Sequence, residues 1–131
     1  MIYKRFIPKQ KRVVWWDVEN IAFSLNKQQE KWLNKNHIAV RGFVGKNYDS
    51  KLKDKRIMRF ATQLPEQSDH AISVWSGRWM QKMDEKGIPL RKLETVVVTK
   101  DKFGDAWATV LQQGGVKAKR ITSWKELQNF F

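Results

Sequence analysis

The chain has 131 residues, 41% of them hydrophobic, so it suits one domain with a continuous core. It has no cysteine and two histidines, which excludes disulfides and thiolate-bound zinc and argues against a zinc enzyme. Lys and Arg number 26 against 13 Asp and Glu, and the resulting net charge of +13 predicts an anionic partner, most often nucleic acid.

The first twelve residues form a short basic arm ahead of the folded domain, residues 13–131. Its cations Lys9, Lys11 and Arg12 could contact a phosphate backbone or belong to a loose end. The arm lacks the apolar core of a signal peptide, and no apolar run approaches the roughly 20 residues of a membrane span. We therefore expect a cytoplasmic protein without a membrane segment.

An apolar run at residues 13–16 ends abruptly in Asp17. Its β-branched and aromatic residues predict a strand that is buried on both faces. From Ile21 onward the apolar spacing becomes that of a helix. Ligands of α/β sheets gather at the carboxyl ends of the strands. Asp17 and Asn20 therefore either bind a metal or a phosphate there, or cap the helix.

The next segments predict a strand and then a basic helix. Residues 37–44 form the strand, and Lys46 lies in the loop after it. Residues 51–60 carry apolar side chains at helical spacing. Another face of this predicted helix repeats a cation every four residues: Lys51, Lys55 and Arg59. That face is either solvated or follows a phosphate backbone.

Residues 70–75 are interpreted as a third strand, with Arg78 in the turn at its carboxyl end. A short helix around residues 79–83 would follow and close at Gly87. Residues 94–99 predict a further buried strand, which delivers three charged residues to the same edge: Lys100, Asp101 and Lys102.

The rest of the chain continues the alternation. A helix is expected to begin at Asp105, a short basic strand spans residues 116–121, and Ser123 caps a terminal helix. Strands that alternate with helices predict an α/β domain with one mostly parallel sheet and helices on both faces. The strands at residues 13–16 and 96–99 should be interior neighbours, with residues 117–121 towards an edge.

Two blocks of the sequence resemble NYN domains, which are PIN-like nucleases. Residues 13–20, Val-Val-Trp-Trp-Asp-Val-Glu-Asn, resemble their first strand, which ends in Asp-x-x-Asn. Residues 95–101, followed by a helix and by Gly-Gly-Val at residues 114–116, resemble their later block, in which a strand ends in Ser or Thr and Asp-x-Asp-Phe. The resemblance implies a Rossmann-like PIN fold and a metal-dependent nuclease, with RNA favoured over DNA.

The resemblance also implies a site for Mg²⁺ or Mn²⁺. Asp17 and Asp101 would hold the ion, Asn20 and Thr99 would be neutral ligands, and Asp105 would be a third acid. Clustered carboxylates of this kind activate water and stabilise the leaving oxygen in phosphodiester cleavage.

The chain departs from the family pattern at several positions. Asp105 stands two residues beyond the second Asp of the family block, and it could be a plain helix cap. The family's middle acid has only two candidates, Asp69 and Asp84, both poorly placed. The lysines on either side of Asp101 could satisfy its carboxylate without a metal.

Three classes of function therefore stay open. The chain is a metal-dependent nuclease, a PIN-like module that holds nucleic acid without cutting it, or a small phage- or plasmid-type accessory protein that docks on another protein through an aromatic anchor. The predicted nucleic-acid contacts are all basic: Lys9, Lys11, Arg12, Lys46, Lys51, Lys55, Arg59, Arg78, Lys100 and Lys102.

Overall fold

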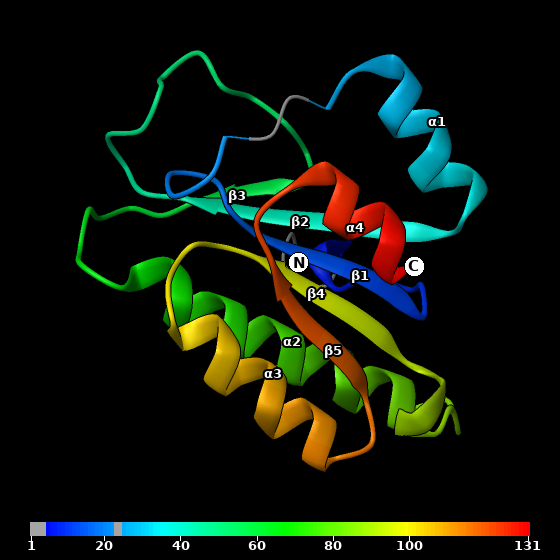
Figure 1. Cartoon of the computed structure of the whole chain (residues 1–131). Coiled ribbons are helices and arrows are strands. Elements are labelled where there is room, and N and C mark those ends of the chain that lie inside the picture. Colours follow the sequence, from blue (N-terminus) through cyan, green and yellow to red (C-terminus); the bar gives the residue numbers. More distant parts are fainter. Residues whose placement is uncertain (1–4, 23–24) are drawn as a thin grey trace.

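The computed structural model describes residues 5–22 and 25–131, and its centre is a sheet of five parallel strands (Figure 1). The strands are β1 (Arg12–Asp17), β2 (Ile38–Val44), β3 (Ile57–Arg59), β4 (Glu94–Val98) and β5 (Lys117–Ile121). Their order is β3-β2-β1-β4-β5, with parallel pairing throughout. The predicted Rossmann-like α/β class is confirmed, with β1 and β4 as interior neighbours and β5 at an edge.

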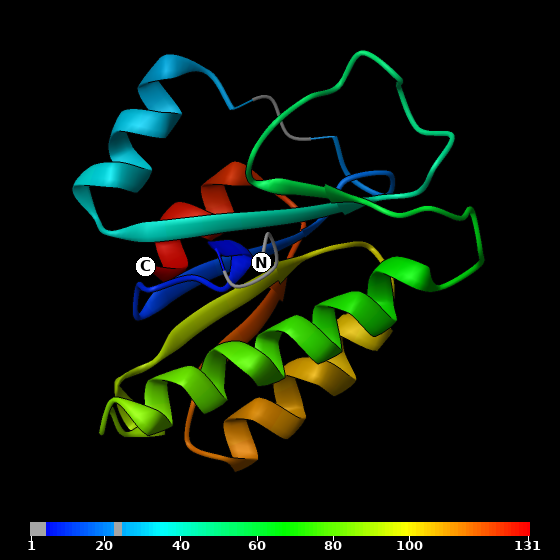
Figure 2. The ribbon, with the colours of Figure 1, turned by 180° about the vertical axis from the view of Figure 1, so that it is seen from behind.

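Helices cover both faces of this sheet (Figures 1 and 2). They are α1 (Lys27–Lys35), α2 (Gln67–Glu85), α3 (Phe103–Gln113) and α4 (Trp124–Phe130), with a short 3-10 turn, η2 (Leu90–Lys92). Because successive strand residues face opposite ways, β1 supplies two cores. Val13 and Trp15 pack in the core under α2 and α3, while Val14 and Trp16 pack in the core under α1 and α4.

The predicted helix at residues 51–60 is wrong. These residues form a loop that leads into β3, and Ile57 lies beside Gly42 of β2. Ile57 pairs as a strand residue because β2 offers it an open edge. The cations at four-residue spacing therefore share no helix face.

The predicted strand at residues 70–75 is also wrong, because this segment lies inside α2. The buried side chains Ile72, Trp75, Trp79 and Met83 fall at helical spacing over the whole segment. That longer period outweighs the short, mostly apolar run at residues 70–75 that was interpreted as a strand. Arg78 consequently lies within a helix rather than in a turn at the carboxyl edge.

The helix predicted from Ile21 begins later than expected, at Lys27. Asn26 caps it through a reciprocal pair of hydrogen bonds with Gln29. The helix cap is therefore neither Asp17 nor Asn20, which were the predicted candidates. Residues 23 and 24, within the predicted helix, lie outside the described residues. In contrast, Ser123 caps α4 as predicted, with its hydroxyl accepting from the Glu126 amide.

Both edge strands of the sheet have features that disfavour pairing with a strand of another chain. β3 has only three residues, and β5 exposes Lys117 and Lys119. Within the described ranges, no helix combines the length and the apolar character needed to cross a bilayer.

Candidate metal site

Asp17 is fixed where β1 ends. Its backbone carbonyl accepts hydrogen bonds from the amides of Asn20 and Ile21, both at 3.1 Å, so the chain turns directly after the strand. The Trp16 indole donates to the Ile21 carbonyl at 2.6 Å and closes the same turn from the core side. The Asp17 side chain is only 6% exposed, because the strand that carries it is buried on both faces.

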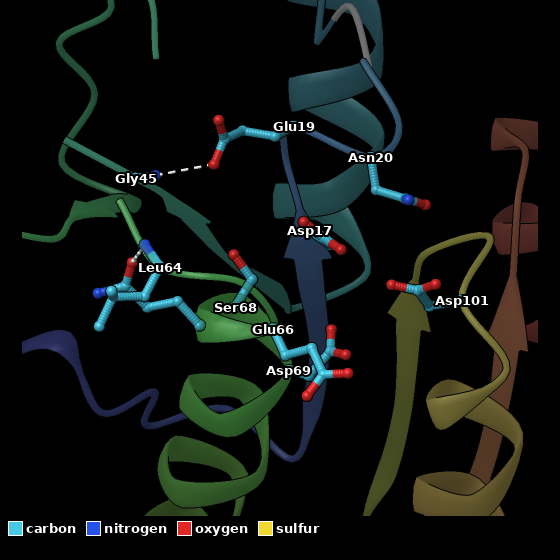
Figure 3. Close-up of a pocket in the computed structure, with 10 residues that line it drawn as sticks. Asp17, Glu19, Asn20, Gly45, Leu64, Glu66, Ser68, Asp69 and Asp101 are labelled. Atoms are coloured by element: carbon cyan, nitrogen blue, oxygen red, sulfur yellow. Dashed lines mark hydrogen bonds between the residues drawn. The ribbon is translucent and has the colours of Figure 1, made fainter. Parts of the chain in front are cut away.

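The topology brings a second and a third acid to the same place. The strand order reverses between β1 and β4, and ligands of doubly wound sheets bind in the crevice at such a reversal. Asp101 follows β4 there, and Asp69 lies in the first turn of α2, which packs on the same sheet. One oxygen from each of Asp17, Asp69 and Asp101 lies within 4.8 Å of the other two. Figure 3 shows the three carboxylates around one space.

The three acids, hereafter the acidic triad, lie in an open hollow of about 240 Å³. Glu19 and Glu66 also line it, so five of the 13 acidic residues of the chain meet here. In a protein with a net charge of +13, this is a local inversion of charge. Hard oxygen donors gathered in this way are the ligands that Mg²⁺, Mn²⁺ and Ca²⁺ prefer. The acidic triad could therefore hold a metal ion.

The electrostatics of the acidic triad point the same way. Burial raises the pKa of Asp17 to about 6, with Asp101 and Glu19 adding repulsion and a hydrogen bond from Thr99 opposing it. Burial likewise raises the pKa of Asp69 to about 6, and the charges of Asp101, Asp17 and Glu66 add to the shift. Both carboxylates are thus costly to ionise unless a cation or a proton lies between them.

Thr99 and Asn20 connect the two strand ends. The Thr99 hydroxyl lies 3.3 Å from Asp17 Oδ2 and 3.2 Å from Asn20 Oδ1, and it accepts from the Asp101 amide at 3.1 Å. Asn20 Oδ1 also accepts from the Lys100 amide. These bonds hold the loop after β4 against the turn after β1. Direct ligation of a metal by Thr99 or Asn20 would require some of them to break.

The structure does not bring Asp105 into the acidic triad. Its carboxylate accepts from Arg120 Nε at 2.9 Å in an exposed ion pair, and it does not line the hollow. Asp69 takes the third place, whereas Asp84 lies near the other end of α2. The interpretation of residues 70–75 as a strand hid this role of Asp69. A helix there would place its first turn, and Asp69 with it, at the carboxyl edge of the sheet.

Glu19 also lines the hollow, although it is not among the predicted site residues. Its carboxylate accepts from the Gly45 amide at 2.9 Å and from the Gln63 side chain at 3.3 Å. It thus ties the turn after β1 to the loop after β2. Glu66, which also lines the hollow, has a left-handed backbone (φ 59°), a strained conformation for a residue with a side chain.

The predicted cations separate into three groups. Lys46, Lys100 and Lys102 are exposed in loops at the carboxyl edge, near the hollow. In the described ranges neither of the lysines that flank Asp101 forms an ion pair with it. The arm cations Lys9, Lys11 and Arg12 lie at the opposite, amino edge, where Arg12 pairs with Glu94 at 3.3 Å.

The remaining predicted cations have mixed roles. Arg59 is committed to the protein itself, because its guanidinium donates to the backbone carbonyls of Gly45, Lys46, Tyr48, Asp49 and Leu52. Arg78 lies over the Trp75 ring at 5.0 Å. Lys51 and Lys55 are exposed on the loop between β2 and β3.

Comparison with known proteins finds no relative: no family model matches the chain, and no curated protein or solved structure is significantly similar to it.

Proposed function

We propose that the chain is a divalent-metal-dependent nuclease that hydrolyses phosphodiester bonds, with RNA favoured over DNA as substrate. The observation that carries the proposal is the acidic triad, in which three separate elements supply carboxylates within 4.8 Å of one another. The net charge of +13 supports a polyanionic substrate. The resemblance of residues 13–20 and 95–101 to NYN domains supports the same reaction.

The donor set fits Mg²⁺ or Mn²⁺. Both ions take carboxylate oxygens, and both usually keep several waters beside one or two protein carboxylates. The graded exposure of the triad suits this, since Asp17 is buried, Asp69 is half-buried and Asp101 is exposed. A bound ion would lower the pKa of a coordinated water and offset charge on the leaving oxygen.

The protein's own groups would orient this chemistry. Asp17 is the rigid member, because the buried strand and the Thr99 hydroxyl fix its carboxylate. Asn20 and Thr99 hold the loop after β4 by accepting from the amides of Lys100 and Asp101, which keeps Asp101 near Asp17. Lys46, Lys100 and Lys102 are exposed at the rim and would bind phosphates on either side of the scissile bond.

A second candidate function is a module that binds nucleic acid without cutting it. The pairing of Asp105 with Arg120 supports this alternative, because it leaves three acids for the site instead of four. Binding to the exposed lysines requires no catalytic carboxylate. The two candidates differ in their need for metal: cleavage requires the divalent ion, whereas binding persists in EDTA.

The test is cleavage of a single-stranded RNA with Mn²⁺, with Mg²⁺ and with EDTA. We expect cleavage with either ion and none in EDTA. Asp69→Asn should lower the cleavage rate at least about 100-fold, because it removes one ligand of the ion. The matched controls are Asp84→Asn, on the same helix, and Asp105→Asn, and both should retain most of the activity. An Asp105 variant that is inactive while the Asp69 variant is active would overturn the assignment of the site.

A further inference from the structure

The charge of the protein is divided between the two edges of the sheet. The carboxyl edge, on the left in Figure 1, carries the acidic hollow. At the amino edge, where the strands begin, the arm, the end of α2 and η2 together carry a group of exposed cations: Lys9, Lys11, Lys86, Arg91 and Lys92. These five residues are hereafter called the amino-edge patch. None of them forms an ion pair with a described residue.

Hydrogen bonds hold the segments of the amino-edge patch side by side. The Lys11 carbonyl accepts from the Glu94 amide at 3.0 Å, which places the arm beside the chain that leaves η2. The Gln10 carbonyl accepts from the buried Trp79 indole at 2.9 Å, which ties the arm to α2. The amino-edge patch is therefore built on ordered backbone rather than on a loose tail.

Compensation of the helix dipole explains little of the amino-edge patch. Cations near a helix C-terminus are stabilised by its carbonyls, and this accounts for Lys86 at the end of α2. Lys9 and Lys11 belong to no α-helix, and Arg91 and Lys92 lie in a single 3-10 turn. Like charges on one edge that have no acidic partner repel one another, so an anionic partner would relieve this edge.

We propose that the amino-edge patch is a second contact site for the phosphate backbone of nucleic acid, separate from the acidic hollow. The identity of the partner rests on the proposed function. β1 (Arg12–Asp17) separates the two sites by about 17 Å at about 3.3 Å per residue. A single-stranded nucleic acid of about 16 nucleotides spans roughly 54 Å at 3.4 Å per phosphate, so it is long enough to reach both the acidic hollow and the amino-edge patch.

The experiment measures binding of a single-stranded RNA of about 16 nucleotides in EDTA across a salt series. Without metal the hollow repels phosphate, so binding reports on the basic surfaces. We expect Lys11→Gln, Arg91→Gln and Lys92→Gln together to weaken binding roughly tenfold at low salt and to flatten the log–log salt slope by about 2. The control carries the same loss of charge on α1 and α4, as Lys27→Gln, Lys31→Gln and Lys125→Gln, and should bind more tightly than the patch variant.

The outcomes separate this proposal from the proposed function. Equal weakening in both triple variants would mean that binding follows net charge alone, and this overturns the amino-edge patch while nucleic-acid binding stands. A wild type that binds no RNA but binds vesicles of anionic phospholipid would overturn the partner, and with it the nucleic-acid function. The stabilisation of the patch variant by Mn²⁺ should equal that of the wild type, which shows that the fold and the acidic triad are intact.

Discussion

At the scale of single residues, the carboxylates of the acidic triad that would bind a metal lower the stability of the metal-free protein. Asp17 and Asp69 both have a pKa of about 6, above the value of 3.8 for an unperturbed Asp. The folded protein therefore holds more protons than the unfolded chain between these values, and stability falls as the pH rises through this window. A protein that keeps such a cluster gives up stability at neutral pH that a bound cation would restore.

Asp17→Asn tests this relation in EDTA. The variant keeps the shape of the side chain but has no charge. Its free energy of unfolding at pH 7.5 should therefore exceed that of the wild type by about 1–3 kcal/mol. Near pH 4, where the wild-type carboxyl is protonated, the difference should shrink towards zero. Urea unfolding at both pH values measures it, with the exposed Asp84→Asn as control. A difference that does not change with pH would contradict the account.

At the scale of elements, continuous apolar runs were the reliable signal in the sequence. They gave β1, β4 and the place of Asp17 and Asp101 at neighbouring strand ends. β3 could not be predicted in this way, since its three residues become a strand only by pairing with the edge of β2. α2 was not predicted because the short apolar run at residues 70–75 was interpreted without the helical period that extends to Met83, and the role of Asp69 was missed with it.

The loop between β2 and β3 shows how an element can decide the role of a residue. Sequence spacing assigned Arg59 to a phosphate-binding face together with Lys51 and Lys55. The structure instead directs its guanidinium to five backbone carbonyls of the loop. A fork of five donors can satisfy such a set of acceptors, whereas the ammonium group of Lys cannot reach them all.

Arg59→Lys therefore separates charge from structure. We expect faster amide hydrogen exchange across residues 45–56 and a loss of about 1–3 kcal/mol in the free energy of unfolding, although the positive charge is retained. Lys55→Gln, an exposed neighbour on the same loop, should change neither quantity measurably. If Arg59→Lys behaves as the wild type while Arg59→Gln only weakens RNA binding, the side chain acts through its charge.

At the scale of the whole molecule, the important quantity is the distribution of charge. The net charge of +13 supports the proposed polyanionic partner, but the total conceals an edge where five carboxylates meet. No count from the sequence could reveal this, because Asp17, Asp69 and Asp101 come together only through the topology of the sheet. On the proposed function, the positive surface would attract a phosphate backbone, and a cation in the negative hollow would admit a phosphate to the site.

The most direct test of the central claim is a crystal structure of the protein soaked in Mn²⁺, with an anomalous difference map calculated at the manganese absorption edge. We predict a peak in contact with carboxylate oxygens of Asp17, Asp69 and Asp101, at distances of about 2.0–2.3 Å, and no such peak in an Asp69→Asn crystal. A map without manganese between these three side chains, or with manganese at Asp105 instead, would contradict it.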